Sequence, residues 1–248
     1  MRIVQAVFLD VGWTLAYPQV SMWEIFADLC AQAGAPTTPE ACEQLVRHLW
    51  RSGQSHAEAQ FHAGASYPDS DEMFAGQFVQ TGMVIFSQMG VTDGHADLTQ
   101  RFLQAFWNET NWARFPDTLD GLAALKARGV RLGVLSNAPS DMPRFLERLG
   151  ILPYLDFAVV SALEGMKKPD RRIFAAALAR AGVEPAAALH VGDMYFEDIV
   201  GGRAAGVNTL LMERGRNALF PSFRESDGRG LTAAALVTSL GDVVERLR

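Results

Sequence analysis

The sequence has few cysteines, no long apolar run and no cluster of basic residues. Its only two cysteines, Cys30 and Cys42, form no Cys-x-x-Cys pair, so we expect no disulfide framework and a reducing, cytoplasmic setting. No apolar run approaches the roughly 20 residues of a membrane span. The N-terminal run "IVQAVFL" is interrupted by Asp10 and precedes no cleavage site, which argues against a signal peptide. A net charge of −6 without a basic run argues against nucleic-acid binding.

The composition favours a folded chain with a sizeable core. Hydrophobic residues make up 49% of the 248 residues and charged residues 20%, as in globular proteins. Short apolar runs predict strands at residues 3–9, 130–135, 157–160, 188–191 and 207–211. Helical patterns that begin at capping residues and end at glycine occupy residues 117–129 and 169–182. Strands that alternate with helices predict βαβ units and a parallel sheet, in which ligands bind outside the carboxyl ends of the strands.

Residues 17–112 differ in composition from the rest of the chain. They contain no lysine, three arginines and eleven acidic residues, a formal charge of −8, whereas the remainder carries +2. They are rich in Trp, Phe, Met, Gln and Ala, with helical patterns at residues 22–34 and 40–53 and no convincing strand. We therefore expect an acidic helical insert after the first strand.

Polar side chains follow several of the predicted strands. The set comprises Asp10, Thr14, Ser136, Asn137, Lys168, Asp193 and Asp198. A carboxylate nucleophile, hydroxyl and backbone donors, one fixed cation and an acidic pair are what phosphoryl transfer to a carboxylate requires. Two carboxylates and a backbone carbonyl, together with waters, suit Mg²⁺.

The order and spacing of these residues resemble the haloacid dehalogenase-like (HAD) hydrolase superfamily. "DVGWT" looks like its first motif, D-x-D-x-T, and "LSN" like its second, while "KKPD" and "GDMYFED" look like the third and fourth. The resemblance spans residues 3 to about 212. It implies a Rossmann-like three-layer α/β/α core with a parallel sheet, formed by residues 1–16 and 113–248. It also implies a mobile helical cap of the subfamily I type at residues 17–112.

The resemblance implies a role for each polar residue of the set. Asp10 would be the nucleophile that forms an aspartyl-phosphate, and Mg²⁺ would be held by Asp10, the backbone carbonyl of Gly12 and Asp193. Asp198 would orient the metal site and Lys168 without binding the metal itself. The phosphate of the substrate would be bound by Thr14, Ser136, Asn137 and Lys168, and Lys168 would also be catalytic.

One position departs from the pattern of the superfamily. Most of its phosphatases have a second Asp two residues after the nucleophile, which protonates the leaving group and then activates water. This chain has Gly12 there. Its backbone carbonyl can still contact the metal, but the residue that carries out the acid–base step is missing. General acid–base catalysis typically raises the rate by about 10²–10⁴-fold. Asp141 is a possible substitute, although an Asp at a helix N-terminus is the commoner explanation.

Two other interpretations of the same residues remain open, and a third, phosphonate cleavage, nearly fails. A metal-independent 2-haloacid dehalogenase would need a cap arginine, for which Arg47 or Arg51 is available. A phosphonate-cleaving member would need a cap lysine, which this insert lacks. A catalytically impaired module could keep the fold and bind a phosphate ligand or a protein. The retained acidic residues favour phosphate over halide.

The predicted function is therefore Mg²⁺-dependent hydrolysis of a small phosphorylated molecule, by an enzyme with a weakened acid–base step. The sequence indicates neither the physiological substrate nor the oligomeric state. His190 is expected to be a packed strand residue, Lys167 to be an ordinary surface lysine, and Glu197 to be a charge at a helix N-terminus that the helix dipole favours. His56 and His62 lack convincing zinc spacing.

Overall fold

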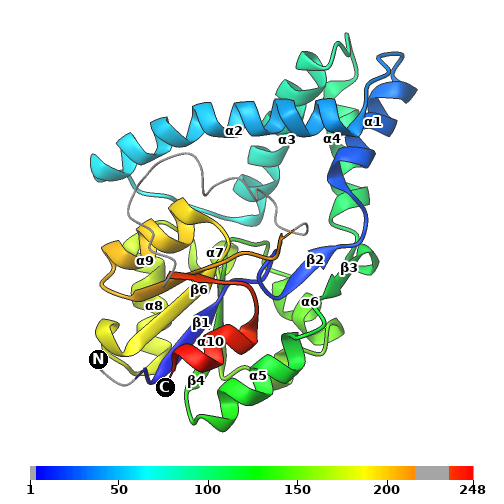
Figure 1. The fold of residues 1–248 in the computed structure, drawn as a ribbon. Helices are drawn as coiled ribbons and strands as arrows, with labels where there is room; N and C mark the ends of the chain where they lie inside the picture. The colour runs from blue at the N-terminus through cyan, green and yellow to red at the C-terminus, as the bar shows by residue number, and fades with distance from the viewer. Residues whose placement is uncertain (1–3, 216–234, 248) are drawn as a thin grey trace. The chain divides into compact units, whose positions relative to one another are not determined.

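The computed structural model describes residues 4–215 and 235–247, apart from the side chains of residues 50–58 and 109. Within these ranges the chain forms two compact units (Figure 1). The first comprises the residues up to 17, the segment 66–70 and the residues from 114 onward, and the second comprises residues 18–65 and 71–113. Ile3, where the first predicted strand begins, lies outside the described residues, as do residues 216–234 of the expected core.

The first unit is built on a six-stranded parallel sheet in the order β5-β4-β1-β6-β7-β8. Its strands are β1 (Ala6–Leu9), β4 (Arg131–Ser136), β5 (Phe157–Val160), β6 (Ala188–Gly192), β7 (Asn208–Met212) and β8 (Leu236–Val237). The central strand β1 pairs with β4 and β6, so that Phe8 lies beside Gly133 and His190. The predicted parallel α/β fold is confirmed, and the two-residue edge strand β8 is an addition that the sequence did not predict.

Helices cover both faces of this sheet (Figure 1). α8 (Arg171–Ala181) and α9 (Gly201–Ala204) lie on one face, and α5 (Thr118–Ala127) and α10 (Leu240–Arg246) lie on the other. A cluster of buried apolar side chains joins α8 to the sheet and includes Phe8, Leu135, Val159, Ile173 and Phe174. Burial of such surface, at about 25 cal/mol per Å², holds the layers together.

The ends of α8 follow from its sequence and fix the residue before it. Asp170 at the N-cap accepts a hydrogen bond from the backbone N–H of Arg172 at 3.0 Å, which satisfies a donor of the first turn. Gly182 ends the helix with a φ of 66°, a left-handed conformation that favours glycine. The helix thereby holds Lys168 two residues before its cap.

Short elements fill the connections of the first unit. They are α6 (Met142–Arg148), α7 (Ser161–Glu164), the 3₁₀ turns η2 (Leu152–Tyr154) and η3 (Pro185–Ala187), and the π-helical segment η4 (Tyr195–Val200). Segments of π-helix are rare and occur frequently at functional sites. η4 begins three residues after the end of β6, beside the carboxyl end of the sheet.

The second unit consists of helices. They are α1 (Met22–Gln32), α2 (Pro39–His62), α3 (Asp71–Gln88) and α4 (His95–Phe106), followed by the 3₁₀ turn η1 (Glu109–Asn111). Two short strands, β2 (Ala16–Pro18) and β3 (Trp112–Arg114), pair with each other where the chain passes from one unit to the other. The sequence did not indicate these two strands.

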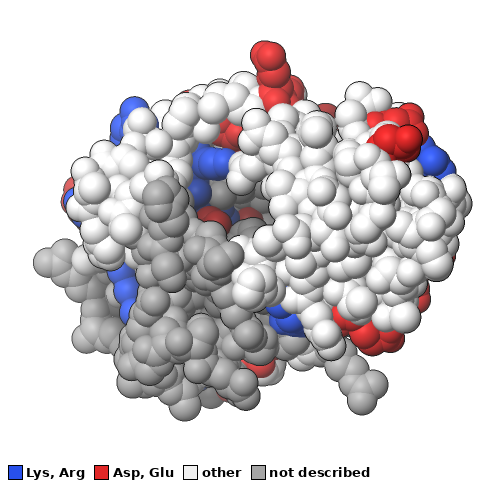
Figure 2. Space-filling model, turned by 90° about the horizontal axis from the view of Figure 1, so that it is seen from above, with Lys and Arg blue, Asp and Glu red and all other residues white. Residues whose placement is uncertain are grey.

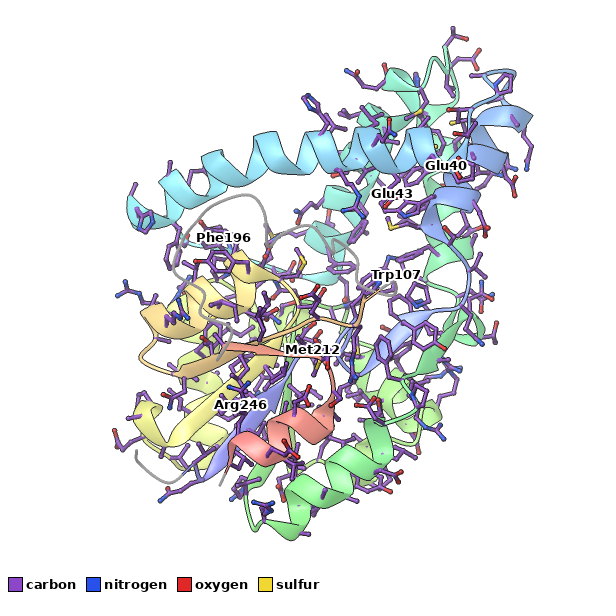
Figure 3. All side chains as sticks on the ribbon, in the orientation of Figure 1. Glu40, Glu43, Trp107, Phe196, Met212 and Arg246 are labelled. Carbon is purple, nitrogen blue, oxygen red and sulfur yellow. The ribbon has the colours of Figure 1, made fainter. Side chains whose placement is uncertain are left out.

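Aromatic rings make up much of the interior of the second unit. Phe26 on α1 stacks on Phe102 on α4, with ring centroids 4.0 Å apart. Trp107, labelled in Figure 3, stacks on Trp112 with ring centroids 5.4 Å apart.

Charged residues are unevenly distributed along the chain. No residue from 73 to 92 is charged, and uncharged residues cover much of the face of the molecule shown in Figure 2.

The structure also bears on two expectations drawn from the composition. Cys30 and Cys42 are both buried and both are free thiols, as expected for core cysteines. None of the helices in the described part of the chain is long and apolar enough to cross a membrane.

Candidate active site

Asp10 lies at the carboxyl end of the central strand β1 and opens a tight turn. The carbonyl of Val11 accepts a hydrogen bond from the N–H of Ala16 at 3.0 Å. Trp13 has a φ of 50°, a left-handed conformation that is rare for a bulky residue and typical of functional turns. The Oγ1 of Thr14 is buried and has no hydrogen-bond partner among the described residues. Because buried hydroxyls are normally hydrogen-bonded, this one is available to a ligand.

Arg214 anchors the far end of this turn. Its Nη2 and Nε donate to the carbonyl of Thr14 at 2.7 and 3.1 Å. Its Nη1 donates to both carboxylate oxygens of Asp117 at 2.9 Å, and its guanidinium lies 4.4 Å from the centroid of the Phe115 ring. The segment after β7 is thereby tied to the turn after β1. No sequence pattern pointed to Arg214.

Lys168 connects two of the acidic residues. Its Nζ donates to Oδ1 of Asp10 at 2.8 Å and to Oδ1 of Asp198 at 2.6 Å. Burial acts to lower the pKa of this amine, but the charges and hydrogen bonds of the two carboxylates raise it above its usual value. Lys168 is therefore a fixed cation at the carboxyl edge of the sheet.

Asn137 and Ser161 fix the loops around Lys168. The Nδ2 of Asn137 donates to the carbonyl of Lys168 at 3.0 Å, and its Oδ1 accepts from the N–H of Lys168 at 2.8 Å. The hydroxyl of Ser161 accepts from the N–H of Ala138 at 2.8 Å and donates to its carbonyl at 3.2 Å. Ser136 is buried at the end of β4. Both polar ends of the Asn137 side chain are thus engaged in holding Lys168, a role that the sequence did not reveal.

Asp198 is surrounded by donors. Besides Lys168, its Oδ1 faces the Nε2 of His190 at 2.8 Å, and its Oδ2 accepts from the backbone N–H of Met194 at 2.9 Å. Burial acts to raise the pKa of Asp198, but the charges and hydrogen bonds of Lys168 and His190 lower it below its usual value. Gly192 makes this arrangement possible, because a Cβ at that position would lie 2.2 Å from the carboxyl carbon of Asp198.

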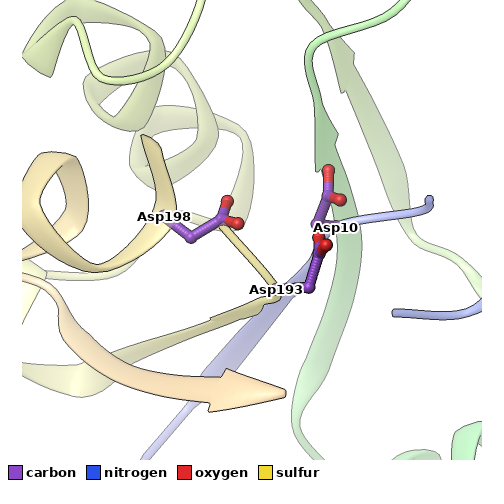
Figure 4. Close-up of side chains that lie close together, drawn as sticks. All are labelled: Asp10, Asp193 and Asp198. Carbon is purple, nitrogen blue, oxygen red and sulfur yellow. The ribbon is translucent and has the colours of Figure 1, made fainter. Parts of the chain in front are cut away.

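Three carboxylates converge at the carboxyl ends of β1 and β6 (Figure 4). Asp10, Asp193 and Asp198 each offer an oxygen, and these oxygens lie within 4.8 Å of one another. Burial, followed by repulsion from the neighbouring carboxylates, raises the pKa of Asp193 well above its usual value. Burial also raises the pKa of Asp10. A divalent cation would relieve this repulsion, and Asp10 and Asp193 are the available ligands because Asp198 already has its donors.

Two further ionisable residues lie near this cluster, one of them buried and the other partly buried. His190 is packed in β6, as predicted, but it also contacts Asp198. Glu197, predicted to be a charge at a helix N-terminus, lies in the first turn of η4 and has a buried Oε2 with no partner among the described residues. Burial and the charge of Asp198 raise the pKa of Glu197 to about 7. A histidine inside an apolar strand was the sequence signal that could have pointed to the contact between His190 and Asp198.

One stretch of the expected insert packs beside the loop that precedes α8. The N–H of Lys167 donates to the carbonyl of Tyr67 at 2.9 Å, and the N–H of Asp69 donates to the carbonyl of Gly165 at 3.2 Å. The N–H of Tyr67 donates to Oδ2 of Asp170 at 3.3 Å. These contacts explain why residues 66–70 belong to the unit that carries the sheet.

The turn at Gly12 has open space. A Cβ added there would have no neighbour within 4 Å, and the φ of Gly12 is outside the left-handed region. Neither sterics nor backbone conformation therefore requires glycine. Asp141, the substitute considered from the sequence, is exposed at the N-cap of α6, as expected of a residue at a helix end.

Comparison with known proteins places the chain in a family. A model of the haloacid dehalogenase-like hydrolases matches residues 5–206. The chain belongs to this family. It is 32% identical over 220 residues to haloacid dehalogenase-like hydrolase domain-containing protein 3 of Homo sapiens, covering 88% of this chain and 84% of that protein. It is 34% identical over 131 residues to a glyceraldehyde 3-phosphate phosphatase of Methanothermobacter thermautotrophicus, covering 52% of this chain and 58% of that one.

Solved structures share the HAD fold at low sequence identity. YfnB of Bacillus subtilis, described as a HAD-hydrolase and solved bound to magnesium, superposes with a TM-score of 0.69 at 20% identity, over the whole of both chains. A 2-haloacid dehalogenase of Pseudomonas syringae gives a TM-score of 0.57 at 24% identity, covering 99% of this chain and 98% of that one. Because both kinds of enzyme share it, the fold alone does not choose between phosphate and halide chemistry.

Proposed function

We propose that this HAD-family hydrolase is a Mg²⁺-dependent phosphatase that acts on a small phosphorylated metabolite through an aspartyl-phosphate on Asp10. The observation that carries the proposal is the network in which Lys168 bridges Asp10 and Asp198 while Asp193 lies in the same carboxylate cluster. The relative named as a glyceraldehyde 3-phosphate phosphatase supports the same reaction class.

The residues at the carboxyl end of the sheet fit a magnesium ion. Asp10, Asp193 and the backbone carbonyl of Gly12 would hold it, and hard oxygen ligands are those that Mg²⁺ prefers. When bound, the metal supplies positive charge to the phosphoryl oxygens. Asp198 would not bind the metal, because its two oxygens already accept from Lys168, His190 and the backbone.

The reaction divides into two steps on Asp10. In the first, a carboxylate oxygen of Asp10 attacks phosphorus, forming an O–P bond while the bond to the leaving group breaks. The ammonium of Lys168, 2.8 Å from Asp10, neutralises the charge that develops there. The hydroxyls of Thr14 and Ser136 and the backbone at Asn137 orient the phosphate. In the second step water attacks phosphorus, which releases inorganic phosphate and regenerates Asp10.

Gly12 limits both steps. Without a carboxylate there, no positioned acid protonates the leaving group and no positioned base deprotonates the water. Aryl and acyl phosphates, whose leaving groups need no proton, should therefore react faster than alkyl phosphates. A Cβ added at Gly12 would meet no other residue within 4 Å, which supports the expectation that no neighbouring side chain takes the place of the second Asp at that point.

Residues 17–112 would act as a cap that governs access to this site. Their formal charge of −8 would repel substrates that carry many negative charges. We therefore expect monophosphates of small neutral molecules to be preferred over nucleoside triphosphates.

The dehalogenase alternative has weaker support. Arg47, one of the two arginines considered for halide binding, pairs with Glu43 one turn away on the same helix at 2.5 Å. The side chain of Arg51 lies outside the described residues. A metal-free halide reaction also has no use for a cluster of three carboxylates, of which Asp10 and Asp198 are buried.

Trapping the phosphorylated protein tests the proposal. The protein is mixed with Mg²⁺ and an aryl phosphate, quenched in acid and digested, and the peptides are analysed by mass spectrometry. We expect phosphate on the peptide that contains Asp10, no phosphate in Asp10→Asn, and normal labelling in the control Asp141→Asn. Labelling that persists in folded Asp10→Asn contradicts the assignment. Activity that survives EDTA, together with halide release from a 2-haloacid, supports the dehalogenase instead.

A further inference from the structure

The ring of His190 lies between two oxygen atoms. Its Nε2 is 2.8 Å from Oδ1 of Asp198, and its Nδ1 is 3.1 Å from the backbone carbonyl of Phe8. The side chain is completely buried. A carbonyl and an ionised carboxylate only accept hydrogen bonds, so both contacts are hydrogen bonds at once only when each ring nitrogen carries a hydrogen.

Packing alone gives no reason for a histidine at this position. His190 lies in the middle of β6, level with Phe8 on β1 and Thr209 on β7, and the edge of its ring meets Phe174 at a centroid distance of 5.4 Å. A valine or isoleucine would fill such a site without bringing polar atoms into the core. Burying a polar ring has a cost unless its hydrogen bonds are made, and one of these bonds leads directly to the site.

We propose that His190 is a positioning residue for the phosphatase reaction, holding the Asp198 carboxylate so that Lys168 stays against Asp10. The proposal rests on the proposed function through the role of Lys168. His190 and Lys168 meet the same oxygen of Asp198, from distances of 2.8 and 2.6 Å.

Loss of the Nε2 donor should act through Asp198. Its Oδ1 would keep only Lys168, so the carboxylate could rotate and the ammonium could move away from Asp10. Partners of this kind, one contact removed from the reacting atoms, typically change activity by about 10–100-fold when they are mutated. Because Lys168 is needed most where charge develops in the transition state, kcat should fall more than KM rises.

Two substitutions separate positioning from simple packing. In His190→Gln the side-chain amide nitrogen reaches the place of Nε2 and can still donate to Asp198. In His190→Asn the amide nitrogen reaches only the place of Nδ1 and can donate to Phe8. We expect kcat to fall by about 10–100-fold in His190→Asn and to be largely retained in His190→Gln, although both lose stability. Phe174→Leu removes the ring contact without touching either hydrogen bond, and it should lower the melting temperature while leaving kcat per folded molecule unchanged.

A second measurement does not depend on turnover. In the ¹⁵N-labelled protein without metal at neutral pH, the two ring nitrogens of His190 are assigned by their absence from the spectrum of His190→Gln. Both nitrogens should show the chemical shifts of N–H groups. A ring with one unprotonated nitrogen, or equal kcat values for folded His190→Gln and His190→Asn, overturns the proposal. If the wild-type protein hydrolyses no phosphate ester, the proposed function fails and the nitrogen spectrum alone decides the state of His190.

Discussion

Two regions beside Asp10, one around Lys168 and one at Gly12, differ sharply in the number of contacts that their residues make. Lys168 is held by two carboxylates through its side chain and by Asn137 through its backbone. At Gly12 a new Cβ would meet nothing within 4 Å. In the proposed reaction the first region would stabilise charge, whereas the second is where most family phosphatases carry their acid–base residue. The difference leads us to expect that charge stabilisation and acid–base catalysis are separable parts of this site, and that the position two residues after Asp10 contributes no side chain to the second.

Removing the positive charge of Lys168 should have the largest effect on activity and on stability. In Lys168→Met, Asp10 and Asp198 lose their shared partner, and breaking a buried ion pair from one side typically costs about 3–5 kcal/mol. Activity should fall by about 10²–10³-fold or more, as when one donor to a developing charge is removed. Urea unfolding and steady-state kinetics measure the two losses.

The neighbour of Lys168 provides a matched control. Lys167→Met removes the same charge one residue earlier and keeps the backbone hydrogen bond to Tyr67. It should leave both activity and stability close to those of the wild type. Comparable losses in the two variants would mean that net charge near the site, rather than the position of Lys168, is what matters.

A smaller effect is expected where Asp198 packs against β6. In Gly192→Ala the added Cβ would lie 2.2 Å from the Asp198 carboxyl carbon, so this side chain must move. Overpacking of this kind typically costs about 1–3 kcal/mol, and activity should fall by about 10–100-fold as Asp198 releases Lys168.

Gly12→Ala is the comparison for stability, since its Cβ enters open space. It should unfold at the same urea concentration as the wild type or at a higher one, because alanine restricts the unfolded chain. If Gly192→Ala is as stable and as active as the wild type, the close approach of Asp198 to β6 does not matter to the site.

Metal binding should raise the stability of the protein by an amount that depends on pH. Burial raises the pKa of Asp10 and Asp193, so without metal the fold loses stability as pH rises from the ordinary Asp value of about 3.9 through the raised values. Mg²⁺ needs both groups ionised, so it competes with protons. At about 100 times its Kd it should add about 2.7 kcal/mol at neutral pH, and the gain should vanish as pH falls toward the ordinary Asp range.

Thermal melts with and without Mg²⁺ across this pH range measure the gain. Asp193→Asn should abolish it, whereas Asp141→Asn, on an exposed helix end, should keep it. A Mg²⁺ gain that is constant with pH, or that survives in Asp193→Asn, would place the metal elsewhere.

The sequence predicted what depends on local pattern. Short apolar runs that alternate with capped helices predict the parallel sheet, and polar residues after the runs predict where Asp10, Lys168 and Asp193 gather. Contacts that residues make across the fold were not predicted, even where the residue itself was. Arg214 bonds the carbonyl of Thr14, 200 residues away, and Asn137 holds Lys168 across 31 residues. Such contacts have no local period or spacing, because only the folded sheet brings the partners together.

The contacts of His190 and of residues 66–70 also could not be predicted from local sequence pattern. A single histidine in an apolar strand has the same local signal whether it merely packs or also bonds a functional carboxylate. Residues 66–70 carry no pattern that marks them as part of the sheet-bearing unit, since their attachment is made by backbone hydrogen bonds to residues 165–167.

The central claim is that Gly12 marks a missing acid–base group. The dependence of the rate on the leaving group tests this claim most directly. We would measure kcat and kcat/KM for one aryl and one alkyl phosphate with the wild type and with Gly12→Asp, for which the turn has room, and confirm folding by circular dichroism. If Gly12 marks a missing acid–base group, the wild type should favour the aryl ester by about 10²–10⁴-fold. Gly12→Asp should then narrow that gap at least about tenfold, mainly by speeding the alkyl ester. A wild-type enzyme that hydrolyses the alkyl ester at an ordinary rate of about 10 s⁻¹, with Gly12→Asp changing both esters equally, would contradict the account and turn attention to Glu197 or Asp141 as the acid.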